Sequence, residues 1–304
     1  MTRLADDVRQ LAAGWRWTRR PLTPRSAEHW LPAPPLKEFP TDWARAPVAR
    51  AIGQALFDFG LKPVTWWAIA PRVAGLDALD GLTPPVLFVS NHASHADTPI
   101  LLGVLPKRWR DRTAVAAAAD YFFDAWWRAA STALVLNTFP IERAGGPLAV
   151  GTAERLIREG WNLVVYPEGT RSQDGWAGRF RHGAASLSLA YRLPCVPIAI
   201  RGSFAAMPRG RGWAVPGRPA VSVRFGPALV PEDGEDFRSL SRRISQAIAR
   251  AWDEDQTTWW DSKRRESRGA TPSIQGPAAS RWRRIWQSTR PLPRPGQPRA
   301  WPRS

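Results

Sequence analysis

Cysteine is almost absent from this chain of 304 residues, which contains Cys195 and no other. A single cysteine excludes an internal disulfide and fits a reducing cytosol. Histidine is scarce as well, with four in the chain. His92, His95 and Asp97 lie close together in sequence, but no further His or Cys cluster completes a zinc shell around them. We therefore expect no metal site.

Long apolar runs are also missing. No stretch approaches the ~18 consecutive apolar residues of a membrane-spanning helix, so no such helix is predicted. The first residues, MTRLADDVRQ, are too polar for a signal peptide. We expect membrane contact to be peripheral and on the cytoplasmic face.

Acidic residues are few: 26 Asp and Glu stand against 43 Lys and Arg, which gives a net charge of +17. Such an excess calls for an acidic partner, namely phosphate esters, anionic lipid or nucleic acid. Residues 262–304 carry much of it, with eleven Lys or Arg and one acid, Glu266. This Arg- and Pro-rich stretch has little to bury and is predicted to be a disordered basic tail.

Tryptophan is abundant, with 18 in the chain, and many adjoin arginine, as in Arg281-Trp282-Arg283. Tryptophan favours the membrane interface, and arginine suits lipid phosphates. An alternative reading is the codon bias of a GC-rich genome. We favour an anionic membrane surface as a partner.

Three regions are predicted. Residues 1–69 hold two amphipathic patterns, one over 2–16 and one from Val48 to Phe59, which ends near Gly60 and Pro63. These helices could lie on a bilayer or pack on the domain, and we assign the region to membrane association. Residues 70–261 are predicted to form the catalytic domain, and residues 262–304 the tail.

The central region alternates strands and helices. Apolar runs predict strands at 85–90, 133–139, 162–166, 196–200 and 221–225, and helices are predicted at 97–104, 115–133, 148–159, 184–191 and 234–255. This alternation is typical of an α/β fold with a mostly parallel sheet covered by helices.

The first candidate site follows the strand at 85–90, where the chain reads Asn-His-Ala-Ser-His-Ala-Asp over residues 91–97. Open α/β sheets place their sites at such strand ends. In a loop that turns into a helix, Asp97 can reach the imidazole of His92 and fix one tautomer, which leaves the other nitrogen free to take a proton. The alternative is that His92 caps the helix or is simply exposed.

Two further strand ends carry arginines. Residues 165–172 read Val-Tyr-Pro-Glu-Gly-Thr-Arg-Ser, in which Gly169 lets backbone N–H groups approach an anion and Arg171 can bind phosphate. Thr170 adds a hydroxyl donor. Residues 139–143, Phe-Pro-Ile-Glu-Arg, deliver Arg143. These groups would meet His92 at one sheet edge, which suits a hydroxyl on a phosphate-bearing substrate, although each could also be an ordinary turn.

The order of these blocks resembles the glycerolipid acyltransferases of the lysophosphatidic acid acyltransferase type. That family has a His-x4-Asp block, a block ending in Arg, a Pro-Glu-Gly-Thr-Arg block and a Val-Pro block, matched here at 91–97, 139–143, 166–172 and 196–198. The resemblance covers roughly residues 70–225. The first and third blocks are specific together. Asn137 stands where the family often has Gly, which leaves the acceptor open.

The resemblance implies a role for each site residue. His92 would be the general base and Asp97 its orienting partner. Arg143 and Arg171 would hold the acceptor phosphate, in a pocket to which Glu168, Gly169 and Thr170 contribute. The donor would be acyl-CoA or acyl-carrier protein, with no metal or other cofactor, and the product would be phosphatidic acid, as in phospholipid biosynthesis. His95 is not required in the family.

Two alternatives remain open from the sequence. The acceptor could be another lysolipid, a glycolipid or an amino-lipid. The chain could also be a non-catalytic protein that binds anionic lipid or nucleic acid through its basic tail. The His92–Asp97 pair argues against the second, because a binding module has no need of it. The aromatic segment 115–133 could line an acyl channel or pack in the core.

Overall fold

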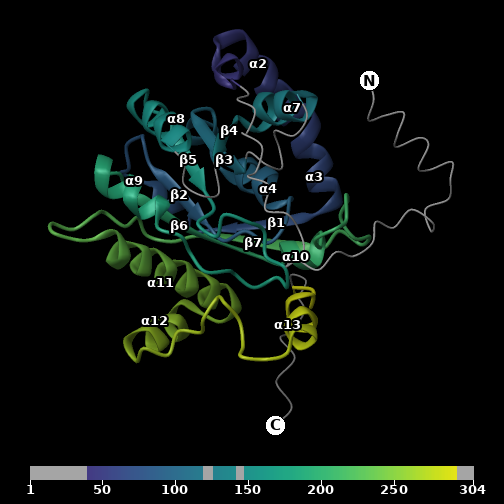
Figure 1. The fold of residues 1–304 in the computed structure, drawn as a ribbon. Coiled ribbons are helices and arrows are strands. Elements are labelled where there is room, and N and C mark those ends of the chain that lie inside the picture. Colours follow the sequence, from purple (N-terminus) through teal and green to yellow (C-terminus); the bar gives the residue numbers. More distant parts are fainter. Residues whose placement is uncertain (1–39, 119–125, 142–146, 293–304) are drawn as a thin grey trace, which may run out of the picture. The chain divides into compact units, whose positions relative to one another are not determined.

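The computed structural model describes residues 40–118, 126–141 and 147–292. These residues contain a seven-stranded sheet in the order β1-β7-β6-β2-β5-β3-β4 (Figure 1). The strands are β1 (Ala70–Ala74), β2 (Leu87–Ser90), β3 (Thr113–Ala118), β4 (Thr138–Ile141), β5 (Asn162–Val165), β6 (Cys195–Arg201) and β7 (Ala220–Phe225). All neighbours pair in parallel except β6 with β7. The prediction of a mostly parallel sheet is confirmed.

Helices cover both faces of the sheet. Side chains alternate between the two faces along each strand, so one strand contributes to two hydrophobic clusters. Leu87 and Val89 of β2 pack in one cluster with α8 (Pro147–Arg158), α9 (Gly183–Tyr191) and α11 (Phe237–Gln256). Phe88 points to the opposite cluster, which includes α4 (Asp97–Val104). A site at the strand ends is therefore supported from both sides.

Further elements include the 3₁₀ turns η2 (Asp42–Arg45) and η4 (Leu76–Leu79), and the helices α5 (Lys107–Arg110), α7 (Trp126–Leu136) and α10 (Ser203–Ala206). None of the helices in the described residues is both long and apolar enough to cross a bilayer.

Two secondary-structure predictions need correction, and one strand was not predicted. The segment 115–133 contains most of β3 and most of α7, while residues 119–125 lie outside the described residues. The strand expected at 133–139 begins at Thr138. Alanine-rich β3 reads as a helix by local preference, but it is buried between β5 and β4, so sheet pairing overrides propensity. The edge strand β1 was not predicted, because Pro71 obscures it.

The amphipathic helix from Val48 continues further than predicted. It runs through α2 (Pro47–Leu56), a π turn η3 (Phe57–Leu61) and α3 (Lys62–Ala68). The wider π turn ends two residues before Pro63, which lies in the first turn of α3 and has no N–H to donate to the helical ladder. The helix expected at 2–16 lies outside the described residues.

The prediction of a disordered tail from residue 262 is wrong up to Leu292. This segment forms α12 (Trp259–Ser267) and α13 (Arg281–Ser288), and it buries Ser262, Ile274 and Leu292. The composition is poor in apolar residues, but a few buried ones and several ion pairs hold the segment against α11 and the loop of residues 172–178. Residues 293–304 lie outside the described residues.

Candidate active site

The loop of residues 91–96 connects the end of β2 to α4, and Asn91 fixes its start. The Asn91 side chain donates from Nδ2 to the carbonyl of Ile200 at 2.8 Å and accepts from the Ile200 N–H at 2.8 Å. The Asn91 side chain and Ile200 are both buried, so these two hydrogen bonds fix the start of the loop to the neighbouring strand β6. The sequence gives no signal for it, since the partners lie 109 residues apart.

His92 and Asp97 meet as the spacing indicates. His92 Nδ1 lies 2.9 Å from Asp97 Oδ2. The same oxygen accepts the backbone N–H groups of Ala93 at 2.7 Å and Ser94 at 2.8 Å. Asp97 is fully buried at the first position of α4, where a carboxylate is favoured by the helix dipole.

This geometry leaves one ring nitrogen of His92 available. A carboxylate at Nδ1 favours the tautomer with the proton there, so Nε2 carries the lone pair. Within the described residues, nothing hydrogen-bonds to Nε2, and the side chain is 14% exposed. The arrangement can therefore accept a proton at Nε2 while Asp97 stabilises the resulting imidazolium.

Tyr166 forms the wall behind the imidazole. Its ring stacks on His92 with centroids 4.1 Å apart and planes 18° apart. Its hydroxyl lies 3.0 Å from Thr98 Oγ1, and burial raises its pKa, so the phenol stays protonated. Tyr166 lies within the third block, but its role could not be predicted from the sequence, because only the fold shows which ring faces His92.

Glu168 ties the two blocks together. Its Oε1 accepts the N–H of His92 at 2.7 Å, and its Oε2 accepts the N–H of Gly178 at 2.7 Å. The N–H of Ser172 in turn donates to the carbonyl of His92 at 2.8 Å. Burial raises the pKa of Glu168 to about 8, against the lowering effect of both N–H donors. Glu168 thus shapes the pocket by holding loops, and its contact with substrate stays a prediction.

The rest of the third block surrounds this pair. Gly169 has a φ of +69°, and a Cβ there would lie 3.1 Å from Arg181 Nε, so glycine suits the turn. Thr170 is exposed and Arg171 is half-buried. Burial and the nearby charge of Arg171 lower the pKa of His95 to about 4. Arg171 therefore lies close to the loop of residues 91–96.

Two further predictions concern Arg143 and the absence of a metal site. Arg143 lies outside the described residues, so its placement stays a prediction. Within the described residues, no three His, Cys, Asp or Glu side chains lie together in a way that could hold a metal ion.

Comparisons with known proteins point to one family. Residues 71–201 match the family model described as Acyltransferase. A chloroplastic 1-acyl-sn-glycerol-3-phosphate acyltransferase of Brassica napus is 28% identical over 141 residues, which is 45% of this chain and 39% of that protein. The enzyme of the same name from Pseudomonas aeruginosa is 31% identical over 120 residues, 38% of this chain and 45% of that protein. The chain thus spans less than half the length of these relatives.

A solved structure has the same fold. It is that of the 1-acyl-sn-glycerophosphate acyltransferase PlsC from Thermotoga maritima, with a TM-score of 0.55 and 22% identity, covering 70% of this chain and 84% of that one. The family match ends at residue 201, so α11, α12 and α13 lie beyond it.

Proposed function

We propose that this chain transfers a fatty acyl group from an acyl thioester to the hydroxyl of 1-acyl-glycerol-3-phosphate. The match of residues 71–201 to the Acyltransferase family model supports the reaction type. The product would be phosphatidic acid, a phospholipid precursor. The names of the relatives support this acceptor, since the proteins above are 1-acyl-sn-glycerol-3-phosphate acyltransferases.

The observation that carries the proposal is the His92–Asp97 pair. The 2.9 Å contact at Nδ1, and an Nε2 that no described residue hydrogen-bonds, suit a general base. In the proposed step, Nε2 takes the proton of the acceptor hydroxyl as its oxygen attacks the thioester carbonyl. The C–S bond then breaks, and the proton passes from His92 to the leaving thiolate. The step needs no metal or prosthetic group.

Phosphate binding is assigned to Arg171 and Arg143. Arg171 lies near His95, which follows the base by three residues in the same loop. A guanidinium can bind a phosphate through two parallel hydrogen bonds. Gly169 and Thr170 would complete this side of the pocket with backbone and hydroxyl donors. The assignment of Arg143 to phosphate binding rests on the sequence pattern alone.

The function is tested with purified protein, palmitoyl-CoA or palmitoyl-carrier protein, and a panel of lysolipids. We expect phosphatidic acid from 1-acyl-glycerol-3-phosphate, identified by mass spectrometry. Arg171→Ala should raise KM for this acceptor far more than it changes kcat, whereas Arg179→Ala, which removes an exposed arginine outside the block, should not. Transfer only to acceptors without a phosphate would contradict the proposed substrate.

We also propose that the chain binds the cytoplasmic face of an anionic membrane, through α2, η3 and α3. This stretch leaves large apolar side chains exposed: Val48, Ile52, Leu56, Phe59, Val64 and Trp67. Phe59 is 87% exposed and Trp67 75%, and large apolar side chains exposed along one helical stretch are typical of interaction surfaces. The net charge of +17 favours anionic lipid.

Vesicle flotation tests the membrane surface. A Phe59→Ser and Trp67→Ser double variant should lose most binding to phosphatidylcholine vesicles that contain phosphatidylglycerol. Trp260→Ser is the matched control, because this tryptophan on α12 is 72% exposed but lies outside the surface. Equal loss in the control, or none in the double variant, would contradict this assignment.

A further inference from the structure

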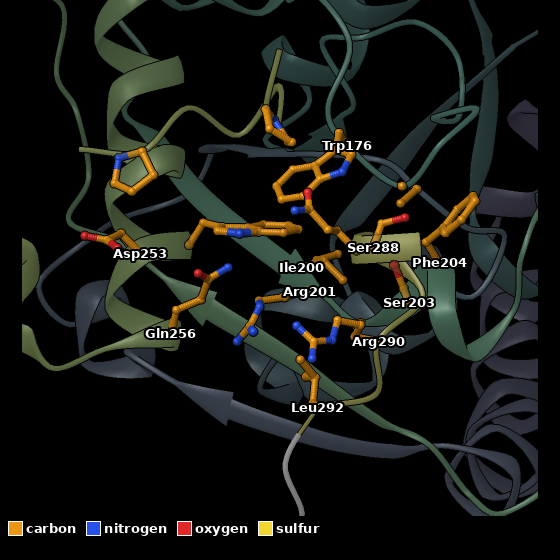
Figure 2. A pocket seen from close by; sticks show the side chains of 18 of the residues that line it. Trp176, Ile200, Arg201, Ser203, Phe204, Asp253, Gln256, Ser288, Arg290 and Leu292 are labelled. Atoms are coloured by element: carbon orange, nitrogen blue, oxygen red, sulfur yellow. The ribbon is translucent and has the colours of Figure 1, made fainter. Parts of the chain in front are cut away.

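A cavity of about 630 Å³ lies beside the catalytic loop and is walled by the C-terminal segment (Figure 2). On one side it is lined by Ala93, the residue after His92, and by the end of β6 at Ile200 and Arg201. On the other side Ser288 and Arg290 close it. Its volume is in the range of sites for small-molecule ligands and cofactors.

Hydrogen bonds hold the wall of the cavity that the C-terminal segment forms. Trp176 donates from its indole N–H to the carbonyl of Arg284 at 3.1 Å, and Ala177 donates to the carbonyl of Ile274 at 2.9 Å. Gly276, with a φ of +79°, lets the indole of Trp176 lie flat against the backbone, because a Cβ there would come within 2.4 Å of it. The C-terminal segment is therefore fixed on the loop that follows the third block.

The lining combines aromatic faces with positive charge. Trp176 and Trp252 lie with ring centroids 6.3 Å apart, and both line the cavity. In Figure 2, Arg201 and Arg290 extend into the same part of the cavity. Rings that can stack on a base, beside guanidinium groups that can bind phosphates, are the chemistry that recognises a nucleotide.

The carboxylates nearby are already neutralised. Asp253 lines the cavity, but Arg265 Nη1 lies 2.6 Å from its Oδ1. Arg201 is paired with Asp255 at 2.9 Å. Arg290, in contrast, pairs with no carboxylate of the described residues; it lies over the ring of Trp286 at 4.9 Å. Arg290 is therefore the cation that leaves the cavity with an excess of positive charge.

The cavity reaches the residue next to the proposed base. Ala93 follows His92 in the loop after β2, and the cavity extends from there along the end of β6 and along Gly175 and Trp176, which follow the Arg171 block. Arg171 itself does not line the cavity, so a ligand there leaves the proposed phosphate-binding arginine to the acceptor.

We propose that this cavity binds the nucleotide part of an acyl-coenzyme A donor, with Arg290 on its phosphates and Trp176 or Trp252 on its adenine. The inference rests on the proposed acyl transfer and deepens it, because it selects coenzyme A over a carrier protein. A carrier protein presents only its pantetheine arm to such a cavity and has no base or diphosphate to fill it.

Direct binding tests the site without catalysis. Isothermal titration of the full chain with coenzyme A should show a single site, with pantetheine binding at least about tenfold more weakly. Arg290→Gln should raise Kd for coenzyme A about tenfold, as expected for a lost charge-assisted hydrogen bond, and Arg290→Glu should raise it further. Arg283→Gln is the matched control, since this arginine is exposed on α13 and does not line the cavity.

Kinetics separate the donor site from general damage. Arg290→Gln should raise KM for palmitoyl-CoA about tenfold with little change in kcat, and should leave KM for palmitoyl-pantetheine unchanged. Equal effects on both donors, no effect on coenzyme A binding, or activity with acyl-carrier protein alone would overturn the inference. If no thioester supports transfer but Arg290-dependent coenzyme A binding persists, the proposed function fails and the binding site stands.

Discussion

The loop of residues 172–178 is held on two sides that differ in chemistry. Toward the strand ends, its Ser172 and Gly178 join the network of His92 and the buried Glu168. Toward the C-terminal segment, Asp174 pairs with Arg284, and the Asp174 carbonyl accepts from Ser288 Oγ. The first side uses backbone donors around a buried carboxylate, and the second uses a partly exposed ion pair.

The two carboxylates respond in opposite directions. Burial raises the pKa of Glu168 to about 8. Burial also acts to raise the pKa of Asp174, but hydrogen bonds from Arg284 and the Trp176 N–H outweigh it and hold that pKa below its ordinary value. The difference indicates that the strand-end side is set by exclusion of water, whereas the C-terminal side is set by charge. Variants can therefore disturb the two sides separately.

The largest effect should come from His92→Ala, which removes the proposed base from the strand-end side. General base catalysis contributes roughly 10²–10⁴-fold, so kcat should fall by that factor. The fold should persist, because His92 contributes its backbone N–H and carbonyl to the network and these remain in the variant. Steady-state kinetics with urea unfolding measures both.

His95→Ala is the control for that change. It removes the other histidine of the same loop, and most of the activity should remain. Near-normal turnover in His92→Ala would rule out the proposed mechanism. A larger loss in His95→Ala than in His92→Ala would move the base to His95.

A smaller effect should be a pH dependence of the free energy of unfolding, caused by the titration of Glu168. Its folded-state pKa of about 8 lies above the ordinary value of 4.5, so the folded state keeps a proton that the unfolded state releases. The contribution to stability is complete below pH 4.5 and is lost as pH rises through about 8. The decline is at most about 1.4 kcal/mol per pH unit.

Glu168→Gln isolates this contribution, because the amide keeps the shape without titrating. Urea unfolding at several values between pH 5 and 8 should show the wild type losing stability relative to the variant as pH rises. Parallel curves would mean that the two N–H donors keep Glu168 ionised throughout. The strand-end side would then be charged like the C-terminal side.

The strand-end side was largely predictable from sequence, and the C-terminal side was not. His92, Asp97 and the third block fall where buried strands end, and local spacing decides their approach. The partners of Asn91 and Tyr166 follow from strand order, which spacing does not reveal. Arg284 meets Asp174 across 110 residues, in a stretch whose composition indicates disorder. A few buried side chains such as Ile274 nevertheless hold this stretch in place. The average composition of the stretch does not reveal them.

The amphipathic segments illustrate the same limit. The stretch from Val48 leaves Phe59 and Trp67 exposed. Helix α13 leaves Trp282 and Trp286 exposed, although its Arg284 pairs with Asp174 in the loop of residues 172–178. Periodicity shows that one face of a helix is apolar. It does not show whether protein or lipid covers that face, because this depends on distant residues.

The smallest effect should come from the C-terminal side. Arg284→Ala breaks the pair with Asp174 and a hydrogen bond to the Pro277 carbonyl, which should cost about 1–2 kcal/mol of unfolding free energy, since partial exposure screens the pair. Arg283→Ala, an exposed neighbour, should cost much less. Urea unfolding measures both variants.

A double-mutant cycle of Arg284→Ala with Asp174→Asn shows whether this side acts through its ion pair. Coupling of about 0.5 kcal/mol or more is expected for residues in direct contact. Each single variant should also lower kcat a few-fold, because Asp174 neighbours Ser172, whose N–H holds the His92 carbonyl. Coupling in stability without any change in kcat would mean that the C-terminal segment only covers the domain. Coupling in both would mean that a segment beyond the family match helps to hold the base in place.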